Sequence, residues 1–239
     1  AAIKKVRDPQ AKEFLLFVFS GILSRANITY HIDPKHAGGG ESGIFMVYRY
    51  WVPPHPDYRD VWKLFQTRAR LVAAAKEKGD LSYGGFNKEK DTFHVYCDSA
   101  ENLNNYVAPG TVDYIYIDPP YGAHIAYLDL STMWHAWLDM EVPPEMRARE
   151  AIENGDQHFD EKHYLEVLQN SFEAMFKALK EDAWLSLVFH HKETNLWYNI
   201  RDMMRYIGFK YVNTVAQPLS KQTFHKIKSP LRVLGESLI

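Results

Sequence analysis

The sequence predicts an α/β protein built on an open, parallel sheet with helices on both faces. Segments of strand-like composition alternate with segments whose apolar residues recur every three or four positions, which indicates strands alternating with amphipathic helices. One segment, Val112–Ile117, alternates little between apolar and polar residues, as a strand buried inside a parallel sheet does. Apolar residues make up 46% of the 239 positions, which is enough to bury one domain with its insertions.

The helices follow from apolar spacing and from the residues that begin and end them. Asp8 and Pro9 form a typical helix start, because a proline in the first turn loses no hydrogen bond. Gly79 and Gly208 follow helical segments at positions where glycine commonly ends a helix. The predicted helices span residues 9–27, 58–78, 164–179 and 196–206, with a helix or turn at 100–106.

The strands are predicted from β-branched and aromatic composition. They span residues 44–52, 92–97, 112–117 and 184–190, and the last strands are expected at 210–214 and 231–239. We expect residues 1–239 to form one domain with insertions at 31–60 and 141–162, both near the cleft. Because the chain begins without methionine and stops inside an apolar stretch, we expect it to be an incomplete domain from a longer protein.

The composition limits which cellular compartment and which binding partners are compatible with the sequence. The single cysteine, Cys97, excludes an internal disulfide and a cysteine-based zinc ribbon, fits a cytoplasmic protein, and is expected to be a buried structural residue. No apolar run reaches the roughly 18 residues of a membrane span. The net charge of −2 gives no general sign of nucleic-acid binding. From Arg201 onward, however, basic residues outnumber acidic ones seven to two, which fits either a phosphate-contacting face or an ordinary solvated surface.

The strongest chemical pattern is Asp118-Pro119-Pro120-Tyr121, directly after the predicted strand that ends at Ile117. Open α/β sheets bind ligands at the carboxyl ends of their strands, and two prolines hold a loop in a fixed conformation. The Asp118 carboxylate and the Pro119 carbonyl are suited to accept the two hydrogens of an aromatic amine, and Tyr121 to stack on its ring. A base in a duplex would have to flip out to reach this loop. The alternative is a strand-end turn without chemistry.

The stretch Val112-Asp-Tyr-Ile-Tyr-Ile-Asp-Pro-Pro-Tyr-Gly122 resembles the catalytic motif of the amino-methyltransferase superfamily. This resemblance implies a Rossmann-like methyltransferase sheet, S-adenosylmethionine as cofactor, and methylation of a base amino group. The Asp form of the motif implies adenine N6 in duplex DNA, and the overall pattern is closest to adenine-specific DNA methylases. Asp118, Pro119, Pro120 and Tyr121 would then be the catalytic residues.

The upstream Val95–Ala100 resembles the family's preceding strand end, where an acidic residue binds the cofactor. The resemblance implies that Asp98 and Ser99, together with Asp118, bind S-adenosylmethionine. The alternative role for Asp98 is to cap the helix or turn at 100–106. The family's glycine-rich cofactor loop is not visible, since Gly38–Gly40 and Tyr83–Phe86 are more typical of turns, and we expect it to lie outside this chain.

Several histidines are candidates for metal ligands. His190 and His191 follow a predicted strand, and we expect them to line the cleft or to cap local backbone groups. Together with His31, His36, His94, His124 and His135 they match no known ligand spacing, so no metal site is expected. Trp134 and Trp137, three residues apart, are expected to pack in the core.

Two other functions stay open. One is methylation of an RNA base, at guanine N2 or adenine N6, which uses a similar loop. The other is a nucleic-acid-binding module without catalytic activity.

Overall fold

The computed structural model describes residues 2–32, 41–83, 93–191, 193–217 and 237–238. The chain divides into two compact units. Unit 1 comprises residues 1–96 and 127–142, and unit 2 comprises residues 97–126 and 143–239. The predictions at Gly38–Gly40 and His36 lie outside the described residues, as do the basic positions 221, 226, 228 and 232.

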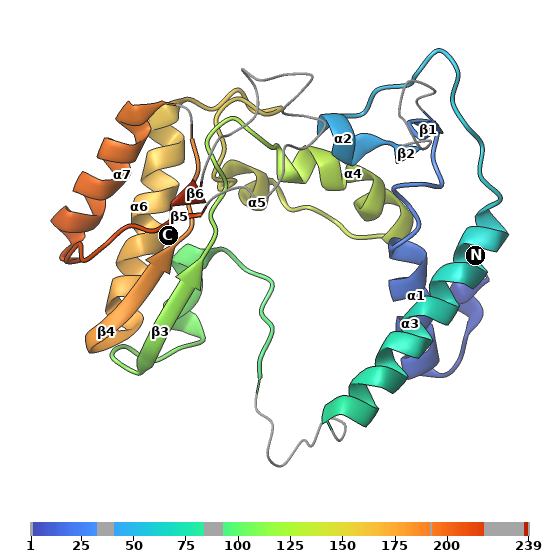
Figure 1. Ribbon diagram of the computed structural model, residues 1–239, viewed down its shortest axis with the longest axis horizontal. Helices are drawn as coiled ribbons and strands as arrows, with labels where there is room; N and C mark the ends of the chain where they lie inside the picture. The colour runs from blue at the N-terminus through green and yellow to red at the C-terminus, as the bar shows by residue number, and fades with distance from the viewer. Residues whose placement is uncertain (1, 33–40, 84–92, 192, 218–236, 239) are drawn as a thin grey trace. The chain divides into compact units, whose positions relative to one another are not determined.

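Unit 2 is built on a parallel pair of strands, β3 (Val112–Ile117) and β4 (Leu179–Leu187) (Figure 1). Their register runs from Tyr114 opposite Trp184 to Ile117 opposite Leu187. The predicted α/β class is therefore supported in its coarse form, as helices and strands with a small parallel sheet. The Rossmann-like sheet stays a prediction.

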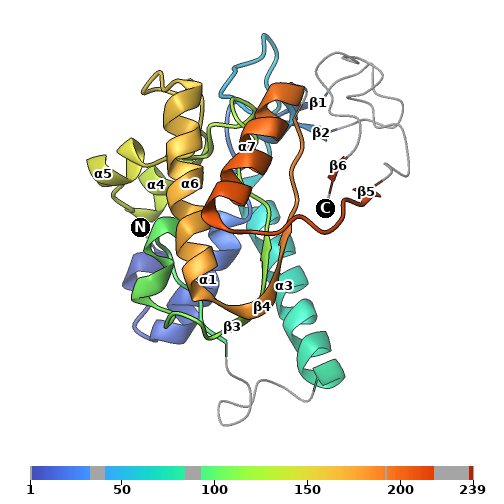
Figure 2. The ribbon, with the colours of Figure 1, turned by 90° about the vertical axis from the view of Figure 1, so that its left-hand side faces the viewer.

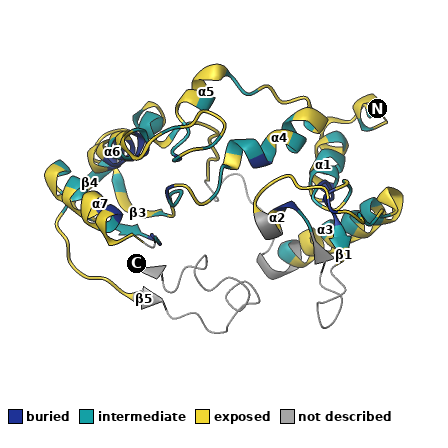
Figure 3. Cartoon of the chain, turned by 90° about the horizontal axis from the view of Figure 1, so that it is seen from above, coloured by how far each residue is buried: buried dark blue, intermediate teal, exposed yellow. Residues whose placement is uncertain are grey.

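Two helices cover one face of this pair. They are α6 (Glu161–Ala178), which begins where the Asp160 carboxylate accepts a hydrogen bond from the His163 amide at 2.8 Å, and α7 (Thr194–Ile207), which ends at Gly208 with φ 123°. Figure 2 shows them side by side beside the strands. Buried residues of these helices form one cluster with Phe189, which follows β4: Tyr164, Leu168, Phe172, Met175, Leu196 and Ile200, against which Ile115, Ile117, Leu185 and Leu187 pack. Figure 3 colours the chain by burial and shows buried positions on both helices.

The other face of the pair is open in the described residues. Tyr114, Tyr116 and Trp184 are 53%, 61% and 58% exposed. The prediction that Val112–Ile117 is buried on both faces is therefore wrong for the described residues. The hydroxyl-bearing tyrosines alternate with Ile115 and Ile117, so the strand has one apolar and one amphipathic face.

Two short helices also belong to the described residues of unit 2. The first, η2 (Ala100–Asn105), precedes β3 and agrees with the predicted helix or turn. The second, α5 (Pro144–Ala148), lies within the predicted insertion at 141–162. Near the end of the chain, β5 (Ala216–Gln217) pairs with β6 (Ser237–Leu238) in antiparallel fashion.

Unit 1 is mainly helical. Its elements are η1 (Ile3–Lys5), α1 (Pro9–Ser20), β1 (His31–Ile32), β2 (Glu41–Ser42), α2 (Ile44–Val47), α3 (Val61–Tyr83) and α4 (Tyr127–Leu138). The predicted start of α1 is confirmed, since the Asp8 carboxylate accepts a hydrogen bond from the Ala11 amide at 2.7 Å. The Trp134 indole donates to the Ser20 carbonyl at 3.0 Å and so joins α4 to α1, whereas Trp137 is 61% exposed rather than in the core.

Three predicted strands are wrong. Residues 44–52 begin with α2, because Ile44 is fully buried and Tyr48, in the left-handed region at φ 49°, ends the turn. The described residues 93–97 and 210–214 contain no strand. Strand propensity depends on a neighbouring strand and a buried face, and these exposed segments have neither among the described residues.

Among the described residues, no helix combines the length and the hydropathy that a membrane span requires.

Candidate functional site

The Asp118–Gly122 loop follows β3 at its carboxyl end. The Val188 amide donates to the Ile117 carbonyl at 2.9 Å, so the pairing of the two strands continues up to the start of the loop. Asp118 is exposed and Gly122 is buried. The loop therefore stands at the edge where parallel sheets bind their ligands, with its carboxylate open to solvent.

Tyr164 of α6 anchors the loop by a hydrogen bond to its backbone. Its hydroxyl donates to the Pro120 carbonyl at 2.6 Å, and its side chain is fully buried. Burial raises the pKa of the Tyr164 hydroxyl, and a hydrogen bond with the Gly122 backbone opposes the shift. Because the hydroxyl stays protonated, it remains a donor to the loop at all physiological pH values.

Tyr121 links the loop to the core and to Asp118. Its ring lies edge-on to the Phe189 ring, with centroids 5.5 Å apart, and its hydroxyl donates a hydrogen bond to the Asp118 carboxylate. Phe189 is fully buried and lies 4.9 Å from Trp197. The structure thus brings together Asp118, Pro120 and Tyr121, three of the four predicted catalytic residues, through direct contacts with one another or with α6; Pro119 lies between them in the chain.

Two further polar side chains reach the loop at Gly122. This glycine has φ 61°, and a Cβ atom there would lie 2.7 Å from Glu153 Oε1 and 3.2 Å from His191 Nε2. The Glu193 amide donates to His191 Nδ1 at 3.2 Å, so in the neutral ring the proton sits on Nε2, on the side of Glu153. His191 therefore lies beside the loop, as the sequence predicted for a residue that lines the cleft.

Glu153 was missed by the sequence analysis. Burial is the main cause that raises the pKa of the Glu153 carboxyl, and the negative charge of Glu161 is the second. His191 lowers this pKa, and Glu193 raises it. The residue lies in the predicted insertion at 141–162, whose polar composition hid it. The signal that would have found it is the neighbouring Ile152, which is 2% exposed in an otherwise polar stretch and indicates a return of the chain to the core.

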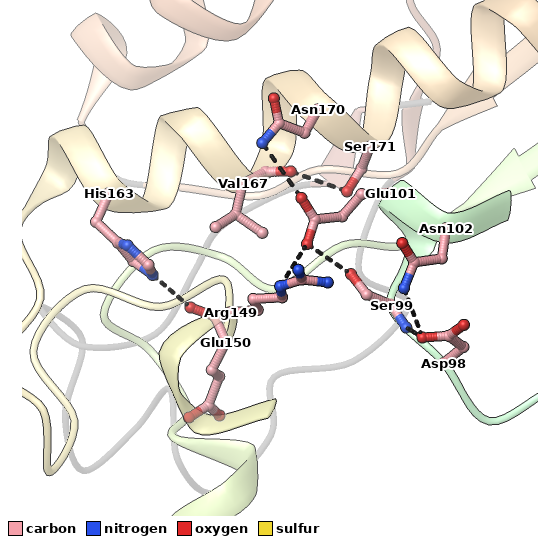
Figure 4. A network of polar contacts seen from close by, with 10 residues as sticks. All are labelled: Asp98, Ser99, Glu101, Asn102, Arg149, Glu150, His163, Val167, Asn170 and Ser171. Atoms are coloured by element: carbon pink, nitrogen blue, oxygen red, sulfur yellow. Dashed lines mark hydrogen bonds and ion pairs between the residues drawn. The ribbon is translucent and has the colours of Figure 1, made fainter. Parts of the chain in front are cut away.

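Asp98 and Ser99 belong to a different hydrogen-bond cluster, at the start of η2 (Figure 4). The Asp98 carboxylate accepts from the Tyr106 hydroxyl at 2.6 Å, the Ser99 amide at 2.7 Å and the Asn102 side chain at 2.8 Å. The Tyr106 hydroxyl, followed by Asn102, lowers the pKa of Asp98. Ser99, not Asp98, is the N-cap residue of η2, and no side chain caps this helix, so the alternative role of Asp98 as its cap is wrong; the three hydrogen bonds leave the carboxylate ionised and exposed.

Glu101 connects this cluster to α6 (Figure 4). Its carboxylate accepts from the Ser99 hydroxyl and the Asn170 side chain, both at 3.2 Å, and lies 3.8 Å from the Arg149 guanidinium. The neighbouring Glu150 carbonyl lies 3.0 Å from His163 Nε2. Segments on either side of β3 are thereby tied to one helix.

An apolar cavity of about 390 Å³ lies between η2 and β3. Its lining includes Ala100, Leu103, Val107, Tyr114 and Ile117. No charged residue belongs to this lining, and neither Asp98 nor Ser99 is part of it.

No protein-family model matches this chain, and no match was found among curated proteins or among solved structures.

The described residues contain no group of three or more His, Cys, Asp or Glu suited to hold a metal ion. His31 packs against Trp51, and His94 stacks on Tyr96. Cys97 is exposed, so the expectation that it is buried is wrong, because no strand forms at 93–97 to bury it. Of the basic C-terminal positions, Arg201 pairs with Asp202 at 3.1 Å and lies over the Tyr198 ring.

Proposed function

We propose that this chain is the core of an S-adenosylmethionine-dependent methyltransferase that methylates the N6 amino group of adenine in DNA. The observation that carries the proposal is the Asp118-Pro-Pro-Tyr121 loop at the carboxyl end of a parallel strand, with its backbone held by a buried tyrosine. A strand-end turn without chemistry has no need of an exposed carboxylate beside a fixed carbonyl.

The loop suits the chemistry of an aromatic amine. The lone pair of N6 is delocalised into the ring, so nitrogen attacks poorly unless its hydrogens are held by acceptors. The Asp118 carboxylate accepts one hydrogen and the Pro119 carbonyl the other, which draws the nitrogen toward a tetrahedral geometry. As the methyl group passes from the cofactor sulfur, which would leave as a neutral thioether, the Asp118 carboxylate would stabilise the positive charge on nitrogen and accept the proton that nitrogen loses.

The hydrogen bond between Tyr121 and Asp118 is one that a bound adenine would have to replace. In this hydrogen bond, the Tyr121 hydroxyl occupies one carboxylate oxygen. An entering adenine replaces this hydrogen bond with one from its own amino group, and the freed Tyr121 ring stacks on the base. Phe189 and Trp197 behind it supply an apolar support for the Tyr121 ring.

The residues present fit the cofactor. S-adenosylmethionine supplies a methyl group activated by a positively charged sulfur. Asp98, ionised and exposed, would accept hydrogen bonds from its polar groups, with Ser99 beside it, and the apolar cavity at Ala100 and Leu103 suits its flat ring system.

The test is methyl transfer from labelled S-adenosylmethionine to duplex DNA, followed by digestion and mass analysis of the nucleosides. We expect N6-methyladenine with the native chain and at least a hundredfold loss with Asp118→Ala, the size typical of removing one group that stabilises transition-state charge. Asp113→Ala is the matched control, since Asp113 is an exposed aspartate on the same strand, paired with Lys180.

Unchanged N6-methyladenine in Asp118→Ala would refute the role of the loop. Methylated guanine or adenine only in RNA would move the assignment to an RNA enzyme. Nucleic-acid binding without binding of S-adenosylmethionine would leave a module without catalytic activity.

A further inference from the structure

Unit 1 exposes large aromatic side chains next to basic ones, at the start of α3 and on the segment that precedes it. Figure 1 shows the course of this segment into α3. Tyr58 is 81% exposed and Trp62 is 65% exposed. Arg59 and Lys63 follow each of them directly in the chain. We call these four residues the aromatic–basic surface. Soluble proteins seldom leave such rings in water beside cations without a partner for them.

The segment that carries this surface is fixed to its neighbour in unit 1. The Asp57 amide donates to the Tyr30 carbonyl at 2.9 Å, and the Asp57 carboxylate accepts from the Ile32 amide at 2.8 Å. The Arg59 guanidinium lies 5.1 Å from the centre of the Tyr30 ring, which is 1% exposed. The aromatic–basic surface is therefore held on buried structure.

The acidic residues of the same segment accept hydrogen bonds from backbone amides. Asp57 accepts from the Ile32 amide, and the Asp60 carboxylate accepts from the Lys63 amide at 3.0 Å at the start of α3. Their charges are partly neutralised by these amides, and the helix N-terminus favours Asp60 further. The four charges of this segment, two acidic and two basic, are balanced, and Lys63 stands exposed directly after Trp62.

Charge is divided unequally between the units. In the described residues of unit 1, Lys and Arg outnumber Asp and Glu, whereas in those of unit 2 the acidic residues clearly outnumber the basic ones. A polyanion therefore meets less repulsion at unit 1 than at unit 2, within a chain whose net charge is −2.

We propose that the aromatic–basic surface binds single-stranded DNA, with bases stacked on Tyr58 and Trp62 and phosphates at Arg59 and Lys63. The choice of DNA rests on the proposed function, whereas the polyanion and the stacking rest on the surface itself. Exposed rings can stack only on bases that are not stacked on each other, which favours an unpaired strand over an intact duplex. Trp62 lies parallel to Phe65, at 5.9 Å and 8°, so its ring already has support on one side.

The experiment is fluorescence anisotropy of a labelled 20-nucleotide DNA strand with the full chain and no cofactor, repeated with the duplex and with RNA of the same sequence. We expect tighter binding of the single strand, and about tenfold weaker binding for each of Tyr58→Ala and Trp62→Ala, since each base–aromatic stack contributes strongly to affinity. Lys63→Ala should lower the dependence of binding on salt.

Matched controls come from unit 2. Tyr206→Ala removes an aromatic ring that is 85% exposed, and Lys177→Ala removes an exposed lysine. Equal weakening by these controls, or full binding by Tyr58→Ala and Trp62→Ala, would overturn the proposal. Tighter binding of RNA or of the duplex would overturn single-stranded DNA as the partner.

The same variants separate this inference from the proposed function. If Tyr58→Ala and Trp62→Ala lose DNA binding while the native chain methylates nothing, the surface stands and the methyltransferase assignment fails. If all variants bind and methylate DNA as the native chain does, the surface fails and the methyltransferase assignment stands.

Discussion

The hydroxyl of Tyr164 donates a hydrogen bond of 2.6 Å to the carbonyl oxygen of Pro120, so a fully buried side chain of α6 fixes the loop that follows β3. Prolines cannot anchor a loop through amide donors, because they have none. The Tyr164 hydroxyl anchors the loop instead, through the Pro120 carbonyl and a hydrogen bond with the Gly122 backbone.

Tyr164→Phe should therefore lower both stability and activity. The substitution keeps the ring and leaves the Pro120 carbonyl without its donor, which costs about 1–3 kcal/mol. Urea unfolding measures the first effect and the methylation rate the second. Tyr198→Phe, at a half-exposed tyrosine of α7, is the control and should change neither. A Tyr164→Phe chain with native stability would contradict the anchoring role.

Gly122→Ala should destabilise the chain more than Gly110→Ala. Both glycines have positive φ, 61° and 68°, so both substitutions carry a backbone cost of about 1–3 kcal/mol. Only at Gly122 does the new Cβ lie 2.7 Å from Glu153 Oε1, whereas at Gly110 no atom lies within 4 Å. Thermal unfolding compares the two. Adding Glu153→Ala should relieve Gly122→Ala, and equal destabilisation by both alanines would show that Glu153 does not crowd the loop.

Glu153→Gln should raise stability at neutral pH. The pKa of Glu153 is raised above its ordinary value of 4.5, first by burial and then by Glu161, so its contribution favours folding at low pH and is lost as pH rises through the folded pKa. The glutamine has no charge to desolvate. The melting temperature of the variant should therefore exceed that of the native chain at pH 7, with the gap closing below pH 4.5. If the difference in melting temperature is the same at pH 7 and below pH 4.5, the buried charge of Glu153 is not its cause.

Asp98→Asn separates the two roles of Asp98. Asparagine keeps an oxygen for the Ser99 amide and the Asn102 side chain, so stability at neutral pH should fall less than in Asp98→Ala. Binding of S-adenosylmethionine, measured by calorimetry, should weaken in both variants if the carboxylate contacts the cofactor. Unchanged binding in both would leave Asp98 with a structural role alone, as the acceptor of its three local hydrogen bonds.

The lowered pKa of the Asp98 carboxylate should also make the stability of the chain depend on pH. Its pKa is lowered below 3.8, chiefly by the Tyr106 hydroxyl, so its contribution is present above pH 3.8 and lost as pH falls through the lower, folded value. The difference in melting temperature between the native chain and Asp98→Ala should shrink as pH is lowered from 7 to 3. A difference that grows in acid would contradict the assignment.

The elements that carry the candidate site could be predicted from the sequence because their signals are local. Val112–Ile117 is a strand, Pro-Pro follows it, and the spacing from Tyr164 onward gives a helix. Contacts between distant segments had no such signal. Tyr164 reaches Pro120 across 44 positions, and Glu153 reaches Gly122 from a polar stretch. Apolar spacing shows that Tyr164 is buried, but not which group its hydroxyl meets.

The predictions of strands at 44–52, 92–97 and 210–214 were wrong for a related reason. Their composition is strand-like, yet a strand forms only where a second one pairs with it, and pairing is set by the rest of the fold. At Ile44 the burial of one side chain was satisfied by a single helical turn instead.

The exposed thiol of Cys97 is the only one in the chain, and it is the first residue of unit 2. A maleimide dye added to the native sequence therefore attaches at one known place, without any need to remove other cysteines. It stands one residue before Asp98 and at the junction with the unit that carries the aromatic–basic surface. One labelled preparation can thus be titrated separately with S-adenosylmethionine and with DNA.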